Sequence, residues 1–429
     1  MLVATAIAIL FVMLVLGAPV ALALAVSGAV GLYLFGGTNM LFGILATTPL
    51  TKASSYELIT IPMFILMAEF VVISRVADDL FDAAAAWIGR LRGGLAMATA
   101  VAGAGFGAIS GSSTAAAATL SSTTIPAMLR QGYEPRLAAG VVAISGTLAM
   151  LIPPSIALIL FGIIADVSVG DLLIGGIIPG VIVTLAIILT VAFLVWQDPG
   201  RAPMGRRYTM REKFAGLRPV WPLLLLFFLV TGTIYTGIAT PTEASGIGAF
   251  GALLIALRAR TLTFGTARAA VLRAAEASSM ILLIIIGAHI FGYFFTLTRT
   301  THDIVAFVGA LDVAPWVILV LILCGYIILG FFMDQIAILI LTVPVVLPVV
   351  LALGFDPVWF GVMVVITAEL GMVTPPLGMN AFVVARFTRR PLGEIFAGIV
   401  PHFWAHLLVI ALLVLVPELV TWLPSTMGR

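Results

Sequence analysis

Polar side chains of this chain gather in a few short stretches of otherwise apolar sequence. Two of these stretches, "AISGSSTAA" and "FFMDQIA", supply hydroxyl, amide and carboxylate oxygens. Their polar residues are Ser110, Ser112, Ser113, Thr114, Asp334 and Gln335. Oxygen ligands of this kind suit a hard cation such as sodium. A helix that ends at such a stretch adds a partial negative charge, and a helix that begins there favours a carboxylate. The two stretches could therefore bind a cation, an organic anion or both.

Two double prolines interrupt apolar runs in a second pair of stretches, "LAMLIPPSIAL" and "LGMVTPPLGMN". Proline lacks a backbone N–H donor and disfavours helix in the residue before it. We therefore expect helices broken at 149–155 and at 371–378. Carbonyl groups freed at membrane depth must be buried in protein or line a wet cavity. Such carbonyls, with Thr374 and Asn380 beside the second break, could hold a cation or an anionic substrate.

The composition is that of a polytopic membrane protein. Of the 429 residues, 62% are hydrophobic and 9% charged, and the mean hydropathy is +1.24, which no ordinary soluble domain combines. The net charge of +2 gives no indication of nucleic-acid binding, and the single Cys324 excludes an intrachain disulfide. The sequence contains no HExxH, GxSxG, Walker or zinc-type cysteine motif, so neither an enzyme nor an ATP-driven pump is indicated.

An internal repeat relates the two halves of the chain. Sliding the sequence by 222 residues superposes the two double prolines and several other prolines and glycines without a gap. The matched prolines are Pro126 and Pro348, Pro135 and Pro357, Pro153 and Pro375, Pro154 and Pro376, and Pro179 and Pro401. We interpret residues 1–200 as a first repeat, 197–218 as a basic linker and 219–429 as a second repeat.

Each repeat is expected to be all-helical and to divide in the same way. Full spans are predicted at 2–16, 19–35, 57–75 and 172–196, and at 219–238, 241–257, 276–297 and 401–424. Broken helices are predicted at 137–165 and 357–385. Extra apolar segments at 93–129 and 313–353 precede them. The first segment leaves about 18 residues per arm, short of the roughly 20 that a crossing needs. We expect re-entrant helical hairpins, with two short tilted spans as the alternative.

The charge distribution predicts the orientation. With five crossings per repeat, 18 of the 21 lysines and arginines fall in loops on one side, which the positive-inside rule makes cytoplasmic. Both termini are then outside, and the two repeats have opposite topology. Inverted repeats with broken helices are typical of secondary transporters.

These motifs together resemble those of one known family. "GSSTA" in a hairpin, "LIPPS", "ATPTEAS", "IPMFILMAEF" and "GMVTPPLGMN", arranged over an inverted repeat, resemble the large membrane subunit of tripartite ATP-independent periplasmic (TRAP) transporters. The resemblance covers essentially the whole chain. It implies an elevator-type, sodium-coupled importer of organic acids in the bacterial inner membrane, with no cofactor besides the coupling sodium ions. It also implies two partners, a small four-helix membrane subunit and a periplasmic substrate-binding protein.

The resemblance further implies where the ions and the substrate bind. A first sodium site would use Ser112 and Ser113 with carbonyls near Ala149, Ile152 and Pro154. A second would use Asp334 with Gly371, Thr374 and Pro376. Substrate would lie between the tips, and its predicted contacts are Ser110, Thr114, Gln335 and Asn380. Family members commonly have glycine where this chain has Ala149, a change that a carbonyl ligand tolerates.

Alternatives to this interpretation remain open at the level of sequence. One is a stand-alone ion-coupled anion or dicarboxylate transporter without a binding protein. Another is an intramembrane enzyme that uses Asp334 and Glu369. Glu69, Glu243 and Glu369 could relay protons, or form ordinary ion pairs and hydrogen bonds. His402 and His406 could ligate a metal, but their place at the start of a predicted span favours an interfacial role. The amphipathic segment 78–93 is predicted to be an interfacial arm.

Overall fold

The protein is helical throughout the part of the chain that the structure describes. The structure is a computed structural model, and it describes residues 2–74 and 76–428. Within these residues only an isolated bridge between Arg92 and Met204 has strand geometry. Six helices are long and apolar enough to cross a membrane, or seven if one bent pair counts as a single span. The expected all-α polytopic fold is therefore confirmed.

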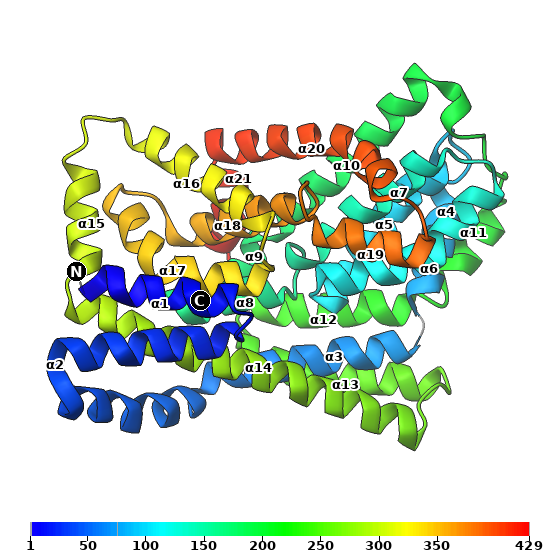
Figure 1. The fold of residues 1–429 in the computed structure, drawn as a ribbon. Helices are drawn as coiled ribbons and strands as arrows, with labels where there is room; N and C mark the ends of the chain where they lie inside the picture. The colour runs from blue at the N-terminus through cyan, green and yellow to red at the C-terminus, as the bar shows by residue number, and fades with distance from the viewer. Residues whose placement is uncertain (1, 75, 429) are drawn as a thin grey trace.

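Six helices from the starts of the two halves pack together, and we call them the scaffold (Figure 1). They are α1 (Leu2–Val15), α2 (Val20–Ala53), α3 (Thr60–Ser74), α12 (Trp221–Tyr235), α13 (Pro241–Arg258) and α14 (Phe264–Leu297). The long α14 lies against both α2 and α3, and α13 lies against α3. A hydrogen bond of 2.8 Å between the hydroxyls of Thr60 and Thr242 and an ion pair of 2.6 Å between Glu69 and Arg273 join these helices.

The remaining long helices form a second group, the core block. Its hairpins are α5 (Gly94–Ser110) with α6 (Ser113–Arg130) and α16 (Pro315–Gly330) with α17 (Gln335–Ala352). Its broken helices are α7 (Pro135–Gly146), η2 (Thr147–Met150) and α8 (Ile156–Ala165), then α18 (Pro357–Met372) and α19 (Met379–Thr388). Outside them lie α9 (Val169–Gly175), α10 (Ile177–Gln197), α20 (Leu392–Leu415) and α21 (Glu418–Ser425). The hairpins enter from opposite ends of the molecule (Figure 1), as the inverted repeat requires.

Short helices connect the two groups at their ends. They are α4 (Val76–Ile88), η3 (Pro199–Arg201), α11 (Met210–Leu217) and α15 (Thr300–Gly309), whereas η1 (Tyr56–Ile59) joins α2 to α3 within the scaffold. The Trp87 ring of α4 meets the Phe214 ring of α11 edge to face, and the Lys213 ammonium lies 5.5 Å from the Trp87 ring centre. The linker is thus attached to the amphipathic arm α4.

The 222-residue offset is visible in the element boundaries. It separates Ser113 from Gln335, where the second hairpin arms begin, and Pro135 from Pro357, where the broken helices begin. Proline is favoured at both of these starts because its missing N–H would have no partner in the first helical turn. The hairpins and broken helices of the two halves are therefore built to one plan.

Several spans differ from their predicted bounds. Helix α2 continues past a turn at Gly37, where φ is 72°, as far as Ala53, beyond the predicted end at 35. Helix α14 begins at Phe264 instead of 276, where Thr263 caps it, and α20 begins at Leu392 instead of 401. The Thr263 cap fixes the start of α14, and Pro401 lies inside α20 instead of starting it. The span predicted at 172–196 is divided near Gly176 into α9 and α10.

Candidate functional site

The first hairpin lies along the first broken helix through a seam of small residues. A Cβ atom added at Gly103 would lie 2.8 Å from the Cβ of Ser145, and one at Gly107 would lie 2.8 Å from the Cα of Ala149. At the tip, a Cβ on Gly111 would lie 3.1 Å from the carbonyl oxygen of Pro154. Glycines at these three positions let the hairpin arm approach the backbone of the break, and they bring the tip to the double proline.

The first break is enclosed by protein and leaves carbonyl groups free. Residues 148–155 are all buried. The Ser155 hydroxyl donates to the Met150 carbonyl and accepts from the Leu158 N–H at 3.2 Å, so it caps α8. Among the described residues, the carbonyls of Ala149, Ile152 and Pro154 accept no backbone hydrogen bond. Buried carbonyls normally have a partner, so these three oxygens are available to a ligand.

The polar residues of the first tip have two different roles. Ser112 caps α6 by accepting from the Ala115 N–H at 3.4 Å, and its hydroxyl lies 3.3 Å from that of Thr114. Ser110 and Ser113 are buried, and their hydroxyls form no hydrogen bond of good geometry with any described residue. An unpartnered hydroxyl in the interior is unfavourable, so these two oxygens are candidates for ligand binding.

At the second tip, the equivalent residues have the same two roles. Asp334 takes the place of Ser112 and caps α17 through a 2.7 Å hydrogen bond from the Ala337 N–H. Gln335 takes the place of Ser113 and is 1% exposed, with both amide atoms unpartnered among the described residues. The Asp334 side chain is exposed. From the sequence we expected this carboxylate to bind an ion; the partner that the structure shows is the N–H group of Ala337 at the start of α17.

The second break differs from the first because it reaches the molecular surface. Residues 375–377 are exposed, and Thr374 donates to the Leu370 carbonyl at 2.6 Å. The Gly371 carbonyl accepts from the Thr374 N–H at 2.9 Å. Beyond the break, Asn380 is buried in α19, and its amide has no hydrogen-bond partner among the described residues. The second break and its hairpin tip thus form the open side of the site.

Glu369 was not among the predicted ligands, yet it points at the first tip. It lies in α18, is 2% exposed, and neither carboxylate oxygen has a hydrogen bond of good geometry among the described residues. The Ser113 hydroxyl is its polar neighbour. The signals in the sequence were its acidic side chain within an apolar run, which we considered for proton relay, and its position two residues before Gly371 at the predicted break.

Comparison with known proteins identifies the family. Residues 7–419 match the family model described as "Tripartite ATP-independent periplasmic transporter, DctM component". The chain belongs to the DctM family. The match confirms the resemblance of the motifs to the large membrane subunit of TRAP transporters. This DctM-family chain is a multi-pass inner-membrane protein.

Named relatives cover nearly the whole DctM-family chain. The C4-dicarboxylate TRAP transporter large permease protein DctM of Pseudomonas aeruginosa is 33% identical and aligns over 94% of each chain. The ectoine TRAP transporter large permease protein TeaC of Halomonas elongata is 29% identical over 96% of each chain. The isethionate TRAP transporter permease protein DctMQ of Oleidesulfovibrio alaskensis is 32% identical over 96% of this chain and 64% of its own.

A solved structure shares the fold at low sequence identity. The YdaH transporter of Alcanivorax borkumensis superposes with a TM-score of 0.66 over 88% of each chain, at 17% identity. This likeness shows the fold alone. The family consists of transporters, which favours transport over the intramembrane enzyme. The two carboxylates of that alternative also lie in unlike environments, Glu369 buried and Asp334 exposed.

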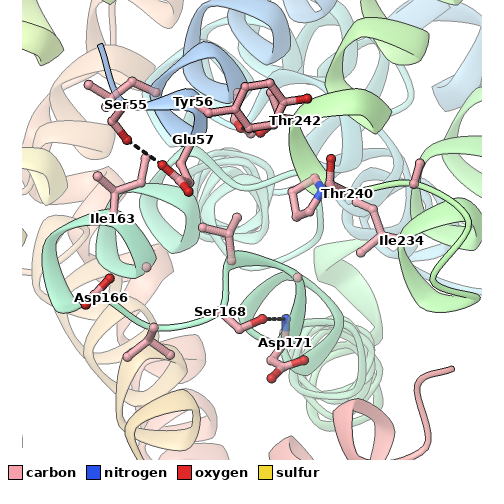
Figure 2. Close-up of a pocket in the computed structure, with 18 of the residues that line it drawn as sticks. Ser55, Tyr56, Glu57, Ile163, Asp166, Ser168, Asp171, Ile234, Thr240 and Thr242 are labelled. Carbon is pink, nitrogen blue, oxygen red and sulfur yellow. Dashed lines mark hydrogen bonds between the residues drawn. The ribbon is translucent and has the colours of Figure 1, made fainter. Parts of the chain in front are cut away.

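A large open cavity lies elsewhere in the DctM-family chain, between scaffold and core block (Figure 2). Its volume is about 760 Å³. One wall carries Asp166, Ser168 and Asp171 around the start of α9, and the other carries Glu57 and Thr240 (Figure 2). None of the predicted ligands lines it. The cavity follows the boundary between the two helix groups, whereas the predicted ligands all lie in the core block.

The other buried polar residues have varied surroundings. Glu69 pairs with Arg273, and Glu243 accepts from the Thr240 N–H at 2.8 Å in a capping box, so ordinary interactions account for both. The interfacial role expected for His402 and His406 is wrong, because both are buried inside α20. The helix starts well before them, and its packing against α7 and α18 encloses the imidazoles.

Proposed function

We propose that this chain is the transport subunit of a sodium-coupled importer of a small organic acid. The observation that carries the proposal is the pairing of each hairpin tip with a broken helix. At the first pair, the tip with the buried hydroxyls of Ser110 and Ser113 packs against a break whose three carbonyls accept no backbone hydrogen bond among the described residues. Oxygen atoms that accept few hydrogen bonds can coordinate a cation that has lost its hydration shell.

The proposed sodium sites follow the two halves of the repeat. The first uses the hydroxyls of Ser112 and Ser113 and the carbonyls of Ala149, Ile152 and Pro154. The second uses Asp334 with the backbone of Gly371 and Pro376 and with Thr374. In the second site the Gly371 carbonyl and the Thr374 hydroxyl already take part in local hydrogen bonds. Each of these oxygens has a second lone pair, which is free to contact an ion.

The proposed substrate position lies between the two tips. Gln335 and Asn380 supply amide donors that are buried and unpartnered among the described residues, and Ser110 and Thr114 supply hydroxyls. The named relatives carry C4-dicarboxylates, isethionate and ectoine, all small molecules with a carboxylate or sulfonate group. Uncharged donors and helix starts can bind such a group without a buried arginine. We therefore propose a small carboxylate or sulfonate as the substrate class.

The proposed mechanism is an elevator motion of the core block against the scaffold. Both hairpins and both broken helices belong to the core block, so ions and substrate would move with it as one body. Each net positive charge carried inward gains about 2.3 kcal/mol per 100 mV. This energy corresponds to about fiftyfold accumulation, so one sodium ion in excess of the substrate charge is an effective driving force.

Two separate polypeptides complete the proposed system. A small four-helix membrane subunit would hold the scaffold, and a periplasmic binding protein would deliver the substrate. The DctMQ relative of Oleidesulfovibrio alaskensis is longer than this chain, which covers 64% of it. We propose that both termini are periplasmic, because the basic loops, including the linker with α11, lie on the other side.

Reconstitution tests the proposal directly. The permease is placed in liposomes with the small subunit encoded beside it, and its binding protein is added outside with radiolabelled succinate, isethionate or ectoine. We expect accumulation of at least one substrate under an inward sodium gradient, and only background uptake with choline in place of sodium. Equal uptake in choline would reject sodium coupling, and equal uptake without the binding protein would favour a stand-alone transporter.

A further inference from the structure

The Glu369 carboxylate has no counter-charge among the described residues. It is 2% exposed, it takes part in none of the ion pairs of the structure, and both of its oxygens lack a hydrogen bond of good geometry. Glu69, by contrast, meets the Arg273 guanidinium at 2.6 Å. A buried carboxylate at membrane depth is costly and is normally paired or functional. The described residues therefore supply no counter-charge for Glu369.

The fold brings Glu369 of the second repeat together with oxygen atoms of the first repeat. Its polar neighbour is Ser113, at the start of α6. The turn η2 packs against α5, α6 and α18, so the first break, the first tip and the helix of Glu369 meet at one place. Besides the carboxylate, this place holds the free carbonyl of Ala149 and the unpartnered Ser113 hydroxyl. One hydroxyl proton cannot satisfy so many acceptor oxygens, whereas a cation contacts all of them.

We propose that the Glu369 carboxylate supplies the fixed negative charge of the cation site at the first hairpin tip. The inference rests on the proposed sodium coupling and adds to it a ligand from the opposite repeat. The position of the first repeat equivalent to Glu369 is Thr147, whose hydroxyl donates to the Ile144 carbonyl at 2.7 Å. At the other tip the carboxylate is Asp334, equivalent to Ser112. Each tip is thus given one carboxylate, but the first receives it from the other half of the chain.

The Glu369 carboxylate also gives the first site a negative charge, which carbonyl groups alone do not supply. A bound sodium ion and Glu369 neutralise each other, so neither needs an arginine or lysine in the interior. The ion then ties α18 of the second repeat to α6 and η2 of the first. Sodium binding at this site would therefore hold the two halves of the core block together before the block moves.

The test measures sodium binding without transport. The full-length purified permease is heated in detergent at constant ionic strength, with sodium chloride exchanged for choline chloride. A ligand that binds only the folded protein raises the melting temperature as it saturates. We expect a saturable increase in the wild type and about a tenfold higher half-saturating sodium concentration in Glu369→Gln, which corresponds to about 1.4 kcal/mol of binding energy.

Two further variants test whether the change in sodium response is specific to the charge of Glu369. Glu369→Asp keeps the charge and should respond to sodium more like the wild type than Glu369→Gln does. Glu276→Gln removes an exposed carboxylate from α14 and should leave the sodium response unchanged. If Glu369→Gln does not elute as a folded protein, the comparison is made between Glu369→Asp and wild type, and the shortened side chain should still raise the half-saturating concentration.

The outcomes separate this inference from the proposed function. A wild-type response that is the same in both Glu369 variants would overturn the assignment of Glu369 and leave sodium coupling intact. A wild type that melts at the same temperature in sodium and in choline would overturn sodium coupling and the Glu369 assignment together.

Discussion

At the scale of single residues, two adjacent residues at each hairpin tip have different roles, and the roles are the same at both tips. The first residue of each pair, Ser112 or Asp334, caps the second hairpin arm. The next residue, Ser113 or Gln335, is buried with no hydrogen-bond partner among the described residues. Local backbone requirements account for the first position, since orphan N–H groups at a helix start need an acceptor. They do not account for the second position, which we propose contacts a ligand.

Replacement of Ser113 separates ligand binding from stability. Ser113→Ala removes a hydroxyl that has no hydrogen bond of good geometry among the described residues, so the melting temperature in choline should change little, by less than about 1 kcal/mol of unfolding free energy. The sodium concentration for half-maximal uptake should rise several-fold. The matched control is Ser122→Ala on the exposed face of α6, which should change neither quantity. Unchanged sodium dependence of uptake in Ser113→Ala would remove this hydroxyl from the site.

At the scale of elements, close helix crossings hold the breaks in place. Helices α7 and α20 meet at Gly140 and Gly398, where a Cβ added to Gly140 would lie 2.3 Å from the backbone of Gly398. Helices α16 and α18 meet at Gly330 and Gly371, with a corresponding distance of 2.8 Å to the Gly371 Cα. Small residues permit such approaches between membrane helices. The second crossing lies at the second break, so packing there sets its backbone geometry.

A substitution at the first crossing tests this packing. Gly398→Ala would place a Cβ 2.1 Å from the Arg136 carbonyl oxygen, and overpacking of this kind costs about 1–3 kcal/mol. We expect a lower melting temperature of the purified permease. Gly393→Ala, on the same helix with no atom within 4 Å of the added Cβ, should be neutral or stabilising because alanine favours helix. Equal melting temperatures of the two variants would show that α7 and α20 can separate freely.

At the scale of the whole molecule, the scaffold and the core block meet at a limited set of helices. Helix α3 touches α5 and α8, α14 touches α17, and α12 touches α9. The cavity of Figure 2 opens along this boundary. A boundary with few contacts and an open cavity is compatible with sliding of one body past the other, which the proposed elevator requires.

A reversible crosslink tests that motion. Gly170 in α9 and Ile234 in α12 lie on opposite sides of the boundary, with 3.6 Å between a Cβ built on Gly170 and the Ile234 Cγ2. In a Cys324→Ser background, Gly170→Cys with Ile234→Cys should stop uptake when oxidised and recover it when reduced. Within the scaffold, Gly248→Cys with Val230→Cys joins α13 to α12 and should leave uptake unchanged. Full uptake with the first crosslink formed would exclude a motion at this boundary.

The sequence by itself determined the features that obey local rules. The double prolines predicted the two breaks, because proline lacks a backbone N–H donor whatever surrounds it. The 222-residue offset related the two halves and predicted that Asp334 and Gln335 would occupy the places of Ser112 and Ser113. The hairpins followed from segment length. The helix starts at Phe264 and Leu392 were missed, since the stability of a helix end depends on what packs against it.

Only the tertiary structure decided which polar groups are left without a partner. Glu69, Glu243 and Glu369 looked alike in sequence, yet the first pairs with Arg273, the second caps its own helix and the third faces Ser113 from the other repeat. His402 and His406 were buried by neighbours remote in sequence. The physical reason is that burial and pairing are set by helix crossings between the two halves, and no local pattern in the chain records which face of a helix those crossings cover.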